Sequence, residues 1–319
     1  MDDILKAYTL KKKTLENYIN VLWSNASKNR KLSSKTKSNY KVALQKFYDE
    51  QMKILDNERR RLILEMTATL SPPKPPPSKK ACLVGINYKN TSYELRGCVN
   101  DVYTLRDLLV SQYGYKIEDI IVLIDEHATR ENILKEFTSL VQQAKSGDSI
   151  CFTFSGHGSY INDKTNEEVD GQDELLVSVD NFAITDDELK IILDTYLNPE
   201  VNFFSIFDSC HSGTVLDLKY AFDNNTTTIT NESYKETKGN VILLSGCRDN
   251  QVSMDAYINN SFQGALSAAF VHTLRNNPNM TWNDLLTKMR EVLLLNNFYQ
   301  IPQISVGKSC NMTDLPIKI

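Results

Sequence analysis

Two short segments hold the residue types that thiol chemistry needs. One contains His157 between two glycines, in the stretch SGHGS, and the other contains Cys210, in the stretch DSCHSG. A cysteine attacks as its thiolate, and an ordinary thiol has a pKa of about 8.5, so it needs a neighbouring base at neutral pH. We therefore take Cys210 as the candidate nucleophile and His157 as its general base. The backbone amides of Gly158 and Cys210 are the candidate oxyanion hole.

Each member of this pair has an alternative. His211 is adjacent to Cys210, but neighbouring residues at the end of a strand usually point apart, which favours His157 as the base. The alternative for Cys210 is a buried, inert cysteine, a role that better suits the thiols of the apolar runs, Cys82, Cys151 and Cys247. The six cysteines have no CxxC spacing, so we expect free thiols and neither a zinc site nor a disulfide framework.

Both segments follow apolar runs that predict buried strands. From residue 80 onward, short apolar runs alternate with segments of helical periodicity, which is typical of an α/β fold with a mostly parallel sheet. The expected strands are 81–86, 120–125, 149–156, 201–208 and 240–246. The expected helices are 100–112, 129–145, 185–196, 262–275 and 282–296. Ligands bind at the carboxyl ends of strands in such a sheet, and His157 and Cys210 follow two of those ends.

The first 70 residues differ in composition from the rest. They carry 15 Lys and Arg against 8 Asp and Glu, a net charge of +7 that leaves the remainder of the chain at −11. Apolar residues at helical spacing predict a helical hairpin, and the prolines of Ser71–Lys80 predict an extended linker. We therefore expect a basic, prodomain-like helical region over 1–70, a linker over 71–80 and a catalytic domain over 81–319. The basic surface could attract nucleic acid or acidic lipid, but we interpret it as a solvated helix face and expect neither a membrane nor a nucleic-acid partner.

Composition and motifs exclude further classes of protein. No apolar run approaches the roughly 18 residues that a membrane span needs, and the N-terminus lacks the pattern of a signal peptide, so we expect a cytoplasmic protein. The sequence has no GxxxxGK[ST], and no GxGxxG between a strand and a helix. We therefore expect no nucleotide and no organic cofactor.

Taken together, the motifs resemble a known family. SGHGS, then DSCHSG, with GCVNDV, DGQDELLVSVD and SGCRDNQVSMDA around them, resemble the caspase-like cysteine peptidases of the metacaspase branch, in clan CD and peptidase family C14, with a type I-like arrangement. The signature of true caspases, QAC, is absent because Asp208 and Ser209 precede the thiol. The resemblance implies a three-layer α/β/α caspase-like fold and a cysteine endopeptidase that works through a Cys-His dyad and an acyl-enzyme. The alternative is a catalytically silent scaffold of the same fold.

The resemblance also implies a substrate preference. Cys98, Asp101, Ser155 and Asp208 match the positions that line the first specificity pocket, S1, in metacaspases. Two carboxylates in one cleft favour a cation, and arginine most of all because its guanidinium binds carboxylates in a bidentate manner. We therefore expect cleavage of proteins and peptides after Arg or Lys. The alternative for both aspartates is a helix cap or a turn.

Acidic residues cluster in the loops beside the active-site segments. Ca²⁺ takes six to eight oxygen ligands, and the calcium positions of metacaspases correspond by resemblance to Asp173, Asp186, Asp187 and Asp217. We therefore expect calcium to activate the enzyme. The loop from Asp173 to Asp186 is shorter than is usual in the family, and Lys219 stands where proline is usual. The alternative is a solvated acidic face.

Activation by self-cleavage is a further expectation. The region Lys219–Lys238 is polar and rich in turn residues, which predicts an exposed loop that a basic-specific peptidase can cut. Lys219, Lys235 and Lys238 are the candidate cleavage sites. The N-terminal region is then the prodomain of a zymogen, and we expect a monomer.

Overall fold

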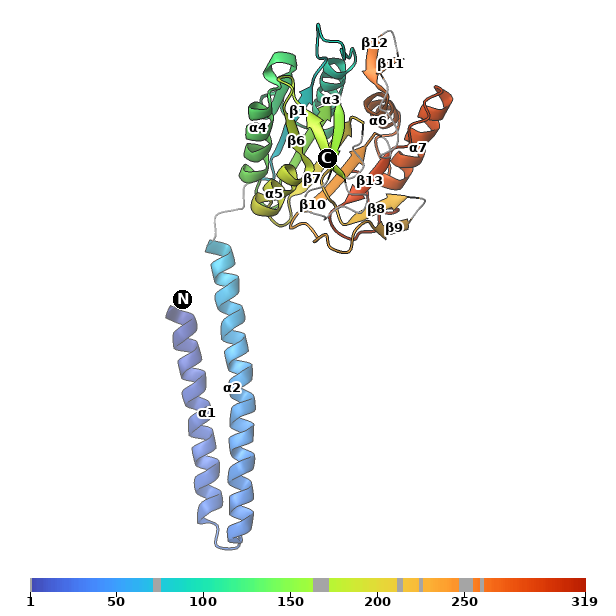
Figure 1. Ribbon diagram of the computed structural model, residues 1–319. Helices are drawn as coiled ribbons and strands as arrows, with labels where there is room; N and C mark the ends of the chain where they lie inside the picture. Colours follow the sequence, from blue (N-terminus) through green and yellow to red (C-terminus); the bar gives the residue numbers. More distant parts are fainter. Residues whose placement is uncertain are drawn as a thin grey trace. The chain divides into compact units, whose positions relative to one another are not determined.

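The computed structural model describes residues 2–70, 76–162, 172–210, 215–223, 226–246, 255–258 and 261–319 (Figure 1). The chain divides into two compact units, Met1–Pro76 and Pro77–Ile319, and each is described by itself. Among the described residues, no helix combines the length and the apolar character that crossing a bilayer requires.

The N-terminal unit is a hairpin of two long helices. The helices α1 (Asp2–Lys28) and α2 (Ser34–Leu70) run side by side in opposite directions (Figure 1). The turn ends where the Ser33 hydroxyl accepts a hydrogen bond from the Thr36 amide at 3.1 Å, which caps α2. The Tyr8 hydroxyl joins the two helices by donating to Asp56 at 2.7 Å. Leu44 is the one apolar side chain buried among the described side chains of this unit.

The second unit is built on an eight-stranded sheet. Its strand order is β2-β1-β3-β7-β10-β13-β8-β9, and the first five are parallel. The parallel strands are β1 (Lys79–Gly85), β2 (Ile120–Ile124), β3 (Ser149–Ser155), β7 (Asn202–Asp208) and β10 (Asn240–Ser245). The antiparallel strands are β8 (Tyr220–Asp223), β9 (Thr226–Ile229) and β13 (Gln303–Val306). Because the parallel strands have their carboxyl ends at one edge, residues that follow them are brought together there.

Helices cover both faces of this sheet, so the three-layer α/β/α fold expected from the sequence is confirmed (Figure 1). The five helices are α3 (Cys98–Tyr113), α4 (Arg130–Gln143), α5 (Asp186–Tyr196), α6 (Ala265–Asn276) and α7 (Trp282–Leu295). Leu105 of α3, Phe270 of α6 and Trp282 of α7 belong to one apolar core. Phe137 of α4 and Leu189 of α5 belong to the other. Alternate residues of β1 enter the two cores, as period-two side-chain alternation requires.

Two smaller sheets and two short turns complete this unit. A three-stranded sheet contains β4 (Gly158–Asn162), β5 (Gln172–Val177) and β6 (Ala183–Thr185). A two-stranded ribbon contains β11 (Asp255–Ile258) and β12 (Ser261–Gly264), which leads into α6. Two 3₁₀ turns are η1 (Ile117–Asp119) and η2 (Asp125–His127).

The expectation of an exposed loop over Lys219–Lys238 is wrong for its first half. Strands β8 and β9 form a hairpin there, and β8 pairs with β13 at the edge of the main sheet. Phe222 is buried where β8 pairs with β13, and this burial stabilises the hairpin. The polar composition of the segment gave no sign of it. The helix expected over 262–275 begins later, at Ala265, because Gly264 ends β12.

Candidate active site

The candidate catalytic residues follow two neighbouring strands. Strands β3 and β7 pair in parallel, and their last residues, Ser155 and Asp208, are partners in the register. His157 comes two residues after the first strand and Cys210 two residues after the second. The Gly156 amide also donates to the Asp208 carbonyl at 3.4 Å. Both candidates therefore lie at the same edge of the sheet.

Gly158 allows the two loops to approach closely. A Cβ atom at Gly158 would lie 2.0 Å from the carbonyl oxygen of Cys210, a distance that no side chain can occupy. Only glycine allows the backbone after His157 to pass this close to Cys210. The two residues expected to form the oxyanion hole are thus in direct backbone contact.

The ring of His157 is oriented by a main-chain carbonyl. Its Nε2 atom lies 2.7 Å from the carbonyl oxygen of Tyr93. A carbonyl only accepts, so Nε2 carries the proton, and in the neutral ring Nδ1 is the nitrogen able to take one. The rings of Tyr88 and Tyr93 pack around the imidazole, with centroids 4.7 and 5.7 Å from it.

Tyr88 holds the backbone of the same loop. Its hydroxyl accepts a hydrogen bond from the His157 amide at 2.9 Å and donates to the Val177 carbonyl of β5 at 2.6 Å. Burial raises the pKa of the Tyr88 phenol, so the hydroxyl stays protonated. The catalytic motifs did not indicate either tyrosine, although the aromatic residues of NYKNTSY after β1 were a signal for them.

The thiols differ in their surroundings. Cys82, Cys98 and Cys151 are buried, whereas Cys210 is half-exposed. Burial raises the pKa of the Cys82 and Cys151 thiols, which keeps them protonated and inert. The other two residues weighed against this pair, His211 and Cys247, lie outside the described residues.

Three of the four expected S1 residues converge. Asp101 is buried, and its Oδ2 accepts a hydrogen bond from the Ser155 hydroxyl at 2.6 Å. The Gly264 amide donates to both oxygens of Asp101, at 2.9 and 3.0 Å. A Cβ atom at Gly264 would lie 2.2 Å from Oδ2 of Asp208 and 2.8 Å from Oδ2 of Asp101. Both carboxylates therefore lie against one glycine, which our sequence analysis did not single out.

Cys98 and Asp208 have structural contacts besides their expected place in the S1 pocket. Cys98 is buried at the start of α3, and its carbonyl packs against Gly85, where a Cβ would lie 2.4 Å from that oxygen. Asp208 also accepts a hydrogen bond from the Ser267 amide in the first turn of α6, at 2.9 Å. The helix-cap alternative for Asp208 is therefore realised alongside its position beside Asp101.

The expected calcium residues are only partly assembled. Asp186, at the start of α5, is buried and accepts hydrogen bonds from the Glu174 and Asp187 amides, both at 2.7 Å. The pKa of Asp186 is raised overall, because burial outweighs the opposing effect of a side-chain hydrogen bond to Glu174. Asp217 is buried and accepts from the Tyr234 hydroxyl at 3.2 Å.

The side chain of Asp173 lies outside the described residues. Over the part of the chain that is described, no three acidic, histidine or cysteine side chains converge to hold a metal ion. Calcium binding by Asp173, Asp186, Asp187 and Asp217 therefore stays a prediction.

The three candidate cleavage sites differ in accessibility. The carbonyl of Lys219 accepts from the Thr230 amide at 2.9 Å, next to the β8–β9 hairpin. Lys238 donates to the carbonyl of Asp194 at 2.7 Å, and its own carbonyl accepts from Lys308 at 2.7 Å. Lys235 is exposed in a segment without regular structure.

Comparison with known proteins identifies the family. The matching family model is described as a metacaspase, peptidase C14 domain, and matches residues 79–219. Metacaspase-1 of Schizosaccharomyces pombe is 33% identical, over 73% of this chain and 68% of its own length. The chain belongs to the metacaspase family. Metacaspase-1 of Meyerozyma guilliermondii is 34% identical, over 71% of this chain and 69% of its own length.

Membership of the metacaspase family confirms that the chain is a cysteine-type peptidase, a hydrolase whose substrates are proteins. A crystal structure of a protein from Geobacter sulfurreducens matches 76% of this chain and 98% of its own, with a TM-score of 0.57. Its sequence is 22% identical, so this likeness bears on the fold alone.

Proposed function

We propose that this metacaspase is an endopeptidase that cleaves after Arg or Lys, with Cys210 as nucleophile and His157 as general base. The observation that carries the proposal is the convergence of Asp101 and Asp208 on Gly264, at the edge where β3 and β7 end. Both carboxylates are buried, and a buried negative pair is stabilised by a cation that completes its hydrogen bonds. The guanidinium of an arginine side chain meets that requirement in a bidentate manner.

The proposed reaction proceeds through an acyl-enzyme. Nδ1 of His157 takes the thiol proton, and the Cys210 sulfur attacks the carbonyl carbon, forming a carbon–sulfur bond. The amides of Gly158 and Cys210 stabilise the resulting oxyanion. The carbon–nitrogen bond then breaks, and the imidazolium gives its proton to the departing amine. Water, deprotonated by His157, hydrolyses the thioester and releases the thiol.

The carbonyl of Tyr93 supports this sequence. It accepts the Nε2 proton of His157 throughout, which favours the tautomer with a basic Nδ1 and stabilises the imidazolium that forms in each half-reaction. The hydroxyl of Tyr88 keeps the backbone of His157 in place. Positioning of this kind matters because small displacements of reacting groups slow catalysis strongly.

We also propose calcium as the activator, bound by Asp173, Asp186, Asp187 and Asp217. Bound calcium would supply positive charge to a group of acidic residues in which Asp186 and Glu174 are both buried. Strand β5, which begins at Gln172, connects this group to the catalytic histidine, since the Val177 amide donates to the His157 carbonyl at 3.0 Å. Calcium bound beside β5 would therefore help to position the loop that contains His157.

The deciding experiment compares fluorogenic peptides that differ only at P1, with Arg, its neutral isostere citrulline, Lys or Asp. We expect calcium-dependent cleavage after Arg and Lys, and none in Cys210→Ala. In Asp208→Asn, the preference for Arg over citrulline should fall by about a hundredfold. This ratio is insensitive to a partial loss of folded enzyme. Turnover of the Asp peptide without turnover of the Arg peptide would refute the specificity.

A second variant tests the geometry of the pocket. Gly264→Ala inserts a methyl group between the two carboxylates and should lower kcat/KM for the Arg peptide by about a hundredfold. Gly114→Ala is the control, because Gly114 caps α3 at a positive φ with no atom near its missing Cβ. Equal activity of both variants would show that Gly264 does not border the substrate.

A further inference from the structure

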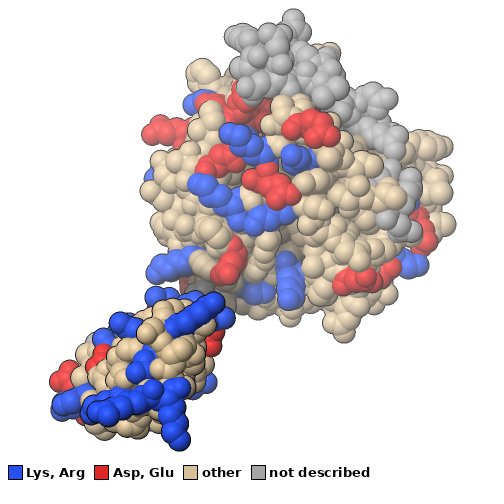
Figure 2. Space-filling view, turned by 90° about the horizontal axis from the view of Figure 1, so that it is seen from below, with Lys and Arg blue, Asp and Glu red and all other residues tan. Residues whose placement is uncertain are grey.

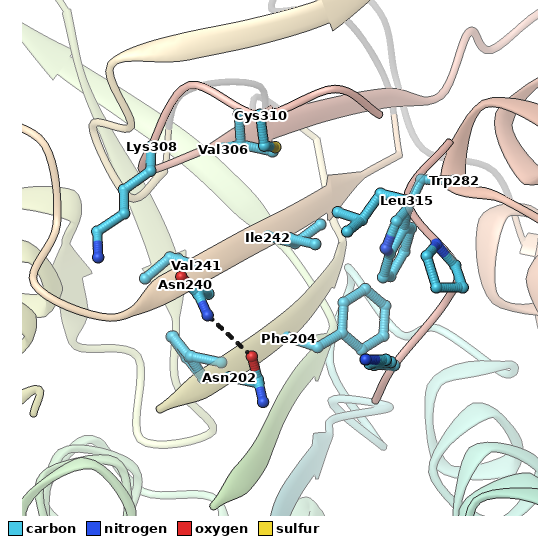
Figure 3. A pocket seen from close by; sticks show the side chains of 13 residues that line it. Asn202, Phe204, Asn240, Val241, Ile242, Trp282, Val306, Lys308, Cys310 and Leu315 are labelled. Atoms are coloured by element: carbon cyan, nitrogen blue, oxygen red, sulfur yellow. Dashed lines mark hydrogen bonds between the residues drawn. The ribbon is translucent and has the colours of Figure 1, made fainter. Parts of the chain in front are cut away.

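The net charge of the helical hairpin lies entirely at the end that holds its turn. Residues 17–48, here called the basic end, contain seven Lys and Arg and no Asp or Glu. These cations are Lys28, Arg30, Lys31, Lys35, Lys37, Lys41 and Lys46. The other half of the hairpin, residues 1–16 and 49–70, carries eight charges of each sign and is neutral. In Figure 2, Lys and Arg side chains dominate the visible end of this unit.

The two halves of the hairpin also differ in their ion pairs. In the neutral half, four of the eight cations have acidic partners, in the pairs Lys11–Glu58 (2.9 Å), Arg59–Asp56 (3.4 Å), Arg61–Glu65 (3.6 Å) and Lys12–Glu16 (4.0 Å). Within the described structure, none of the seven cations of the basic end forms an ion pair. Six of them are exposed, and the half-exposed Lys37 donates to the Ser27 carbonyl at 2.8 Å. The basic end is therefore a concentrated positive charge without internal compensation.

Apolar side chains share the same exposed stripes. Val21 is 57% exposed and precedes Lys28 by seven residues, so the two lie on one face of α1. Val42 is 68% exposed and lies on one face of α2 with Lys35 and Lys46. Phosphate groups of a nucleic acid would neutralise the lysines but leave these valines in water. A lipid interface accepts both, because apolar side chains enter the acyl boundary while lysine stems reach the headgroups.

We propose that the basic end of the hairpin binds the surface of anionic lipid bilayers peripherally. Clusters of four to eight Lys and Arg on an amphipathic helix are typical of such binding, and each cation adds to the affinity. Composition alone led us to expect no membrane partner, since a charge of +7 spread over 70 residues describes many solvated helices. The position of the charge is more informative, because the basic end holds seven cations and no acidic residue. The inference does not depend on the peptidase chemistry.

The test uses the full chain with Cys210→Ala, which prevents self-cleavage. Flotation with vesicles of phosphatidylcholine alone is compared with flotation after addition of phosphatidylserine. We expect binding only to the second kind. Replacing Lys28, Arg30, Lys35 and Lys46 by Gln should weaken it by about a hundredfold or more. The matched control replaces Lys11, Lys12, Arg59 and Arg61 by Gln, removes the same charge and should retain most of the binding.

Three outcomes would overturn the proposal: no binding of the parent chain to anionic vesicles, equal weakening by both variants, or binding of polyuridylate but not of vesicles. Circular dichroism verifies that each variant keeps its helices. Insertion is tested by Val21→Gln with Val42→Gln, which should weaken vesicle binding without changing charge. Unchanged vesicle binding by this double variant would contradict insertion.

Discussion

At the scale of single residues, two tyrosines position His157, the proposed general base. The Tyr93 carbonyl selects the tautomer, and the Tyr88 hydroxyl links the His157 amide to the carbonyl of Val177. The second link crosses from the main-sheet loop to β5. His157 is therefore positioned from two sides by groups far apart in the sequence.

Removing one hydroxyl tests this link. Tyr88→Phe leaves a partly buried amide and a partly buried carbonyl without their partner, so we expect a loss of about 1–3 kcal/mol in the free energy of unfolding. We also expect kcat to fall at least about tenfold with little change in KM, because the base is displaced and the S1 pocket is not. Urea unfolding and steady-state kinetics measure both.

The matched control is Tyr115→Phe. Tyr115 is also buried, but its hydroxyl has no hydrogen-bond partner in the described structure. Loss of that hydroxyl should be neutral or slightly stabilising and should leave kcat unchanged. If the two variants behaved alike, the Tyr88 bridge would have no catalytic significance.

At the scale of elements, the start of α5 contains both a helix cap and a buried carboxyl group that titrates. Thr185 and Glu188 form a capping box, and Asp186 follows the cap as a buried carboxyl whose pKa is raised by burial. Such a group keeps its proton in the folded chain when the unfolded chain has already lost it. The free energy of unfolding therefore decreases as the pH rises from the ordinary Asp value near 3.9 through the raised one.

Chelation and pH together test this element. In a calcium chelator, the wild type should lose stability across that window, and Asp186→Asn should lose less, because it has no proton to release. Calcium should restore the stability of the wild type at neutral pH and not that of the variant. Denaturant unfolding at several pH values gives the comparison. Identical pH profiles for the two proteins would remove Asp186 from the proposed site.

The segment after β9 leads to a prediction about self-cleavage. A peptidase needs an extended, accessible stretch, and Lys235 is exposed without regular structure, whereas Lys238 is held by Asp194 and Lys308. Lys235→Gln should therefore abolish calcium-induced self-cleavage in this segment, and Lys238→Gln should leave it unchanged. Mass spectrometry of the fragments identifies the bond. Cleavage after Lys238 in the wild type would contradict the assignment.

At the scale of the whole molecule, the two units differ in how much apolar surface they bury. The catalytic unit has two large apolar cores, whereas the hairpin has one buried apolar side chain among those described. Burial of apolar surface is the main favourable term in folding, so the hairpin should be the less stable unit.

Each unit contains one of the two tryptophans, Trp23 and Trp282, which makes this difference measurable. In urea, Trp282→Phe reports the hairpin through Trp23, and Trp23→Phe reports the catalytic unit. We expect the Trp23 signal to change at a distinctly lower urea concentration. A single shared transition would mean that the units stabilise each other.

The local pattern of the sequence was sufficient for much of this protein. Apolar runs of strand length and helical periodicity predicted the five parallel strands and the five helices that cover them, because burial of one face imposes those periods. Strands β8, β9 and β13 escaped prediction, since their stability comes from pairing with a sheet edge that no local window contains. Motifs were enough to propose His157 and Cys210 as the catalytic pair, because a thiol nucleophile needs a base, and this assignment stays a prediction.

Only the tertiary structure decided how those residues are supported. The contact of Gly264 with Asp101 and Asp208 joins positions more than 50 residues apart, and the Tyr93 carbonyl that orients His157 has no side-chain identity to recognise. The ion pair between Lys11 of α1 and Glu58 of α2 likewise depends on which residues of α2 face α1. Sequence determines which groups are present and which faces are apolar. Their hydrogen bonds and charge compensation depend on distances that exist only after the chain has folded.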